Sequence, residues 1–124
     1  MPIALGIAIF GALGALARYG VDGISRQRLG AGFPWGPFTV NVVGSFAIGL
    51  VFALILGRAD VPEWLKLSLT GGFLGGFTTF SAFSLQTHRL LAEGAYGLAA
   101  GYVVGSVAAG LVAVGLGVLI GRAF

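Results

Sequence analysis

The chain has 124 residues, of which 57% are hydrophobic and only 9% are charged. A soluble domain usually carries charge on about a quarter of its residues, so this composition predicts a protein whose outer surface faces lipid. The formal net charge of +3 comes from scattered residues and forms no basic cluster of the kind that binds nucleic acid. The absence of cysteine excludes disulfides and thiolate chemistry.

Four apolar stretches are long enough to cross a bilayer, which takes about 20 mostly apolar residues. We expect helices over about residues 3–24, 38–56, 65–85 and 98–120. Pro34, Pro37 and Pro62 each precede an apolar run, at a position where a helix tolerates the missing amide donor. The sequence therefore predicts an all-α membrane protein with four transmembrane helices in a single domain, residues 1–124.

Positive groups are shared equally between the two ends of the expected bundle. One end carries Arg18, Arg26, Arg28 and Arg89, and the other carries Arg58, Lys66, Arg122 and the amino terminus. Orientation in a membrane follows an excess of Lys and Arg on the cytoplasmic side, so a chain without such an excess can insert both ways round. Two copies would then pair antiparallel about an axis in the membrane plane, as the inverted repeats of many transporters do.

Glycine is unusually frequent, with 23 residues. In the fourth expected helix, small residues recur at steps of four: Gly97, Gly101, Gly105, Ala109, Ala113, Gly117 and Gly121. We expect them to form one smooth stripe along the helix, because small residues let helix backbones approach closely in lipid. Helices that pack this tightly leave little room for a pore inside one chain, so we expect an oligomer.

The third expected helix contains a segment that makes a poor helix, residues 70–84 with the sequence TGGFLGGFTTFSAFS. Each glycine costs about 1 kcal/mol relative to alanine in a helix interior, so we expect a break between Gly75 and Thr79, near the bilayer midplane. Backbone groups freed there must meet protein, water or an ion. Broken helices at this depth bind ions in transporters, but a kink filled by a neighbouring helix is an equal interpretation.

Two short polar columns lie in the other apolar stretches. Asn41 and Ser45 are one turn apart in the second helix, and Tyr102 and Ser106 are one turn apart in the fourth. Hydrogen bonding between helices is sufficient to explain a lone serine. An amide is costly to bury unpaired, so Asn41 suits either a binding site or helix packing.

Ionisable residues are absent from the helix centres, and Arg18 is the nearest to one. Its side chain suits either snorkelling to the interface or an electropositive vestibule that gathers anions. The four carboxylates lie in loops or at helix ends, and the single histidine has no partner at metal-ligand spacing. No phosphate-binding loop or nucleophile elbow is present, so we do not expect an enzyme.

Residues 71–83, with the sequence GGFLGGFTTFSAF, closely resemble the signature of the Fluc (CrcB) fluoride channels. Residues 11–19 (GALGALARY) and 41–46 (NVVGSF) agree with the same family, in the right order. The resemblance implies an antiparallel, dual-topology homodimer in the cell membrane, plasma or inner, that exports fluoride passively through two pores. Ala82, Gln86 and Gly110 depart from the threonine, glutamate and hydroxyl residue that are common there.

The resemblance also implies site residues. The fluoride pore would be lined by Asn41, Phe80, Ser81, Phe83, Tyr102 and Ser106, with Arg18 in the vestibule. A structural sodium ion at the dimer centre would be held by backbone carbonyls of Gly75 and Thr78 from each subunit. Amide and hydroxyl donors would replace the water around fluoride, and phenyl rings would offer their electropositive edges. A pore without a full charge would also release the ion readily.

Two other classes of function remain as alternatives. Small four-helix multidrug exporters usually need a glutamate within the first helix, and residues 3–17 contain no acid. Proton-coupled export generally depends on an acidic residue inside the membrane. A non-transporting membrane scaffold predicts no ion flux, and it does not need the break in the third helix.

Overall fold

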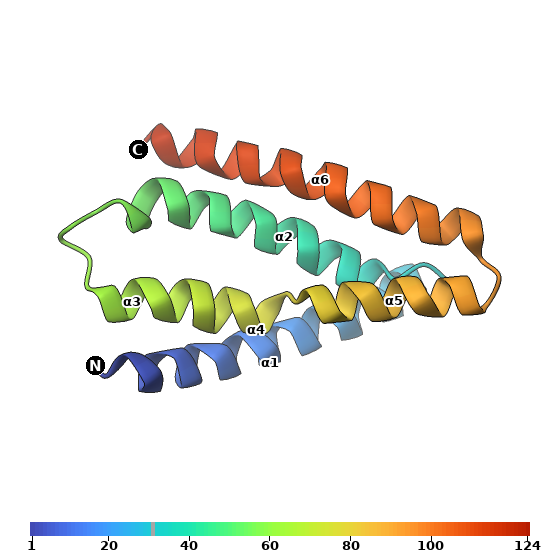
Figure 1. Ribbon diagram of the computed structural model, residues 1–124, viewed down its shortest axis with the longest axis horizontal. Helices are drawn as coiled ribbons and strands as arrows, with labels where there is room; N and C mark the ends of the chain where they lie inside the picture. The colour runs from blue at the N-terminus through green and yellow to red at the C-terminus, as the bar shows by residue number, and fades with distance from the viewer. Residues whose placement is uncertain (31) are drawn as a thin grey trace.

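The computed structural model describes residues 1–30 and 32–124, which fold into an all-helical bundle without β-strands (Figure 1). Three long helical segments are α1 (Ile3–Leu29), α2 (Trp35–Val51) with its π-helical extension η1 (Phe52–Leu56), and α6 (Tyr96–Arg122). The stretch between them consists of α3 (Glu63–Leu67), π-helical η2 (Ser68–Leu74), α4 (Gly75–Phe77) and α5 (Phe80–Ala92).

Within the described residues, three segments are long and apolar enough to span a membrane: Ile3–Leu29, Trp35–Leu56 and Tyr96–Arg122. The third predicted span, residues 65–85, does not appear among them because it is not one continuous helix. Large apolar side chains such as Leu16, Leu111 and Leu119 are about two-thirds exposed. Such a surface is unfavourable in water but suits contact with hydrocarbon.

α1 and α5 end close to glycine turns and not at the limits of the apolar runs. α1 continues to Leu29, beyond the predicted end at residue 24, and stops where Gly30 has a φ of +87°. Gly94, with a φ of +76°, makes the turn between α5 and α6. Positive φ favours glycine because it has no side chain to clash. Polar residues can therefore extend a membrane helix by a turn past its apolar segment.

The two termini lie at the same end of the bundle, together with the α2–α3 connection (Figure 1). The α1–α2 and α5–α6 connections lie at the other end. α2 packs along α6, and α1 packs along η2 and α4. Both contacts bring backbones together: a Cβ on Gly49 would overlap the Val114 carbonyl, and one on Gly14 would overlap the Phe73 carbonyl.

The predicted stripe of small residues on α6 is confirmed at Ala113, Gly117 and Gly121, which are buried, and is wrong at Gly97 and Gly101. A four-residue step turns an α-helix about 40° beyond a full circle, so residues spaced by four wind around the helix. A Cβ on Gly97 or Gly101 would meet nothing within 4 Å. The buried face instead mixes steps of three and four and consists of Ala99, Tyr102, Ser106, Gly110, Ala113, Gly117 and Gly121. Two polar residues of the predicted pore therefore lie inside the bundle.

Candidate functional site

The chain is extended for two residues between α4 and α5. Thr78 has φ −136° and ψ 136°, and Thr79 has φ −137° and ψ 148°. The interruption lies about midway along the bundle (Figure 1). The Thr79 hydroxyl accepts a 3.2 Å hydrogen bond from the Ala82 N–H, which is the usual capping contact at the start of a helix. The Ala82 N–H therefore does not close a helical turn onto the Thr78 carbonyl.

The residues before the break are wound more widely than an α-helix. The Gly75 N–H bonds to the Thr70 carbonyl, five residues back, as in a π-helix, a feature often found at functional sites. This segment is held against α1, since a Cβ on Gly76 would lie 2.5 Å from the Gly11 carbonyl oxygen. β-branched threonines prefer the extended conformation. The α-helix therefore ends at Phe77, directly before Thr78.

A cavity of about 280 Å³ opens beside the break. It is lined by Asn41, Ser45, Thr78, Thr79, Phe80, Phe83, Ser106 and Val107. Four of the predicted pore residues meet there, from α2, α5 and α6, and no lining side chain carries a formal charge. Two others, Ser81 and Tyr102, do not line it. Gly75, predicted as a sodium ligand, lies one helical turn before Thr78.

The orientation of the Asn41 amide is fixed by the break. The Thr78 hydroxyl donates a 2.8 Å hydrogen bond to Asn41 Oδ1. α2 comes this close because Gly44 has no side chain: a Cβ there would lie 2.9 Å from the Thr78 methyl carbon. This bond turns the Asn41 oxygen toward Thr78 and leaves the NH₂ group, a pure donor, for another partner.

Two buried hydroxyl groups make no hydrogen bond within residues 1–30 and 32–124. They are the hydroxyls of Tyr102, which is fully buried, and Ser106, which is 6% exposed. A buried polar group without a partner costs about 1–3 kcal/mol. The Tyr102 ring is held by Phe83, with ring centroids 5.2 Å apart, and by Phe33 at 5.8 Å. Of the two, Ser106 lines the cavity, so its hydroxyl is available to an ion or a water molecule there.

Phe80 and Phe83 form a stacked pair with centroids 5.7 Å apart. Phe83 is partly buried, but Phe80 is 78% exposed on a single chain. An aromatic ring so exposed at the mouth of a cavity can still contact an ion or a second protein chain.

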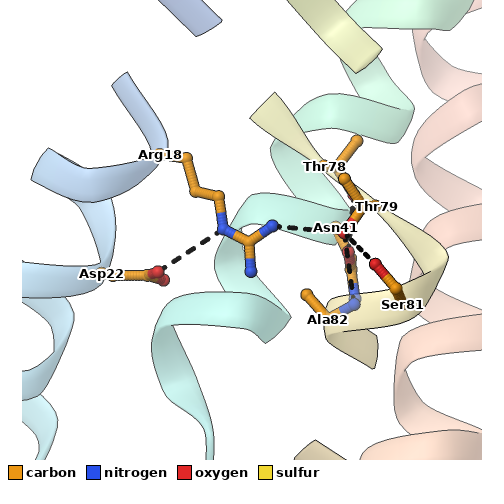
Figure 2. Close-up of polar contacts among 7 residues, drawn as sticks. All are labelled: Arg18, Asp22, Asn41, Thr78, Thr79, Ser81 and Ala82. Carbon is orange, nitrogen blue, oxygen red and sulfur yellow. Dashed lines mark hydrogen bonds and ion pairs between the residues drawn. The ribbon is translucent and has the colours of Figure 1, made fainter. Parts of the chain in front are cut away.

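Arg18 reaches from α1 to the break, as Figure 2 shows. Its Nη1 donates to the Thr79 hydroxyl at 3.5 Å, and its Nε lies 3.6 Å from Asp22 Oδ2. The Thr79 and Ser81 hydroxyls are 3.3 Å apart. Neither interpretation of Arg18 from sequence anticipated this contact. The position of Asp22 one turn after Arg18, at a spacing typical of helix ion pairs, was the available signal.

A second cavity, of about 310 Å³, lies at the end of the bundle where α1 meets α2. Charged residues of both signs line it: Asp22, Arg26, Arg89 and Glu93. Within the described residues no cluster of three or more His, Cys, Asp or Glu side chains is suited to a metal.

Comparison with known proteins identifies the family of this chain. The family model described as "CrcB-like protein, Camphor Resistance (CrcB)" matches residues 5–118. A protein of Geobacter metallireducens named "Fluoride-specific ion channel FluC" is 49% identical over 94% of each chain. Proteins with the same name are 46% identical in Geotalea uraniireducens, over 99% of each chain, and 50% identical in Opitutus terrae, over 94% of this chain and 90% of the relative. This chain is thus a multi-pass membrane protein that belongs to the CrcB family.

Proposed function

We propose that the protein is a fluoride-selective channel, through which fluoride leaves the cell passively. The observation that carries the proposal is the cavity beside the break, which combines amide and hydroxyl groups with two phenyl rings and no charged side chain. Similarity to relatives named as fluoride-specific channels supports the same function.

The cavity groups can replace the water that surrounds fluoride. The Asn41 NH₂ and the Ser106 hydroxyl supply hydrogen-bond donors, and the Tyr102 hydroxyl belongs to the turn of α6 that precedes Ser106. Phe80 and Phe83 offer ring edges, which carry partial positive charge. Conduction needs binding that is weak enough for release, and neutral donors meet this condition better than a lysine or arginine would.

The functional unit of this proposal is an antiparallel homodimer with two pores, each lined by both subunits. The 78% exposure of Phe80 supports it, because the ring needs a second chain to become part of a pore wall. Because Arg18 lies at the break, three positive groups remain at one end of the bundle and four at the other, and so small a difference allows insertion in both orientations. In this dimer the two breaks would lie near the bilayer midplane.

A sodium ion at the dimer centre completes the proposal. The Thr78 carbonyl fits the role, because the Ala82 N–H bonds to the Thr79 side chain instead of to it. The Gly75 carbonyl would supply the second ligand of each subunit. Rings of backbone carbonyls are established ligands for monovalent cations. The ion would tie the two broken helices together and add a fixed positive potential near the anion path.

The alternatives differ in what they need from the cavity. A proton-coupled multidrug exporter generally uses an acid inside the membrane, and the lining of this cavity contains none. A membrane scaffold gives no reason for buried hydroxyls that lack a protein partner. Both alternatives predict no fluoride flux.

The test is ion efflux from proteoliposomes that contain the purified protein, followed with fluoride and chloride electrodes. We expect fast fluoride release without matching chloride release. Phe80→Ala should slow fluoride flux, whereas Phe52→Ala, which truncates another exposed phenylalanine outside the cavity, should not. No fluoride release from folded, dimeric protein would refute the proposal.

A further inference from the structure

We propose that Arg18 is a positioning residue, held in place by Asp22, that sets the direction of the hydrogen bond between the Thr79 and Ser81 hydroxyls. With this direction set, Ser81 presents its proton to the passing anion. This inference rests on the proposed fluoride function and adds a mechanism for anion preference. The residues that carry it are those drawn in Figure 2.

The first step is the contact between Arg18 and Thr79, which are 61 positions apart in sequence. At 3.5 Å it is longer than a typical N–H···O bond, but its donor carries a full charge, and the Arg18 side chain is only 21% exposed. A guanidinium always carries charge and can only donate hydrogen bonds. The Thr79 oxygen must therefore be the acceptor.

The second step is the bonding capacity of the Thr79 hydroxyl. A hydroxyl oxygen has two acceptor positions and one proton. The two positions are taken by Arg18 Nη1 and by the Ala82 N–H. The proton is then left to donate, and the remaining hydrogen-bonded neighbour of this oxygen is Ser81 Oγ at 3.3 Å. Geometry alone permits either oxygen to be this donor, but the two other bonds assign the role to Thr79.

The third step concerns Ser81, which is exposed on the first turn of α5. It does not line the cavity itself but follows Phe80, which does. Once Ser81 accepts from Thr79, its own proton points away from that bond. A free serine hydroxyl rotates and offers a lone pair as readily as a proton, so it suits cations as well as anions. With one of its two lone pairs occupied by Thr79, the Ser81 hydroxyl is biased toward donating its proton, which favours anions. Hydrogen bonds in such a chain also polarise one another, which strengthens the last donor.

Asp22 keeps Arg18 in this role. Its Oδ2 faces Arg18 Nε, while its Oδ1 is buried and makes no hydrogen bond within the described residues. The start of α2 holds it there, since a Cβ on Gly36 would lie 2.9 Å from the Asp22 Cα and would overlap Oδ1. The carboxylate also offsets the charge of Arg18. Arg18 can therefore orient neutral hydroxyls without itself trapping the ion, which a full positive charge in a pore would do.

The simpler interpretation is that Arg18 and Asp22 only tie α1 to the break. A double-mutant cycle separates the two. We expect Arg18→Gln to lower fluoride flux and fluoride-over-chloride selectivity about tenfold, by analogy with the loss of a group that orients a metal ligand. In a Ser81→Ala background, Arg18→Gln should have little further effect on selectivity, because the hydroxyl that it orients is gone. A matched control is Arg58→Gln, which disrupts an exposed Arg–Asp pair.

The cycle is repeated with Thr79→Val in case Arg18→Gln fails to fold. Valine keeps the branched shape of threonine but removes the hydroxyl, so Thr79→Val should reproduce the selectivity loss. Thr79→Ser keeps the hydroxyl and should retain the wild-type selectivity. If the effects of Arg18 and Ser81 simply multiply, or if selectivity persists while only the melting temperature falls, the inference is wrong and the fluoride function stands. If the wild-type protein releases no fluoride, both fall.

Discussion

The two halves of the third apolar stretch are held in the structure by different means. Before the break, η2 and α4 bury Ser68, Gly72, Leu74 and Phe77, largely against α1. After the break, α5 buries only Leu90 of its 13 residues. Its first turn meets the rest of the molecule through the Phe83 ring against Tyr102 and through the capping residue Thr79, which Arg18 contacts. The first half thus provides stability, and the second half leaves side chains free for an ion or a partner chain.

Removal of sodium should have the largest effect, since the proposed ion would join the two halves at their boundary. A ligand present at about 100 times its dissociation constant stabilises the folded state by about 2.7 kcal/mol. The melting temperature of the purified protein should therefore fall when N-methyl-D-glucamine replaces sodium. Thr78→Val keeps the backbone carbonyl and should keep this dependence on sodium. Identical melting in the two salts would contradict the sodium site.

Overpacking of the first half should cost nearly as much. Gly14→Ala places a methyl group against the Phe73 carbonyl, and strain of this kind typically destabilises a protein by about 1–3 kcal/mol. Gly20→Ala, on the same helix, meets nothing within 4 Å and should be neutral or slightly stabilising, because alanine favours helix. Thermal unfolding of both variants would measure the difference, and equal melting temperatures would show that α1 does not hold this half closely.

Disturbance of the second half should alter transport more than stability. Thr78→Val removes the hydrogen bond that orients the Asn41 amide, and we expect fluoride flux to fall about tenfold for loss of such an orienting contact. Thr87→Val is the matched control, because among the described residues the Thr87 hydroxyl bonds only to the Phe83 carbonyl of its own helix. Unchanged flux in Thr78→Val would remove Asn41 orientation from the mechanism.

The smallest effect should come from a change in the α2–α3 connection, where Arg58 and Asp60 form an exposed ion pair. The Arg58 side chain bonds to Asp60 and lowers the pKa of that carboxyl below its usual range. Any stability from this pair is present above the unfolded pKa, near 3.9, and is lost as pH falls through the lower folded value. Both groups are exposed, and exposed pairs contribute little. Asp60→Asn should leave the melting temperature at pH 7 unchanged, and a clear decrease would show that this connection is part of the packed half.

Features that depend on local composition were predictable from the sequence. Apolar length, for example, indicates helices. The grouping of Asn41, Phe80, Phe83 and Ser106 at one cavity was expected only from the resemblance to a family, not from local composition. Features that depend on how helices rotate against one another were not predictable. The Arg18–Thr79 contact requires the relative rotation of α1 and α5, and the spiral of small residues on α6 follows from 3.6 rather than 4 residues per turn.

Because two extended residues lie between α4 and α5, the direction in which side chains point on one helix does not fix their direction on the other. A continuous helix would fix the direction of Phe80 from the direction of Gly76, because each residue adds a set rotation. Thr78 and Thr79 interrupt that rule. The glycines that face α1 and the aromatic residues that face the cavity can therefore change independently during evolution. A short break of this kind lets one membrane segment satisfy two unrelated sets of neighbours.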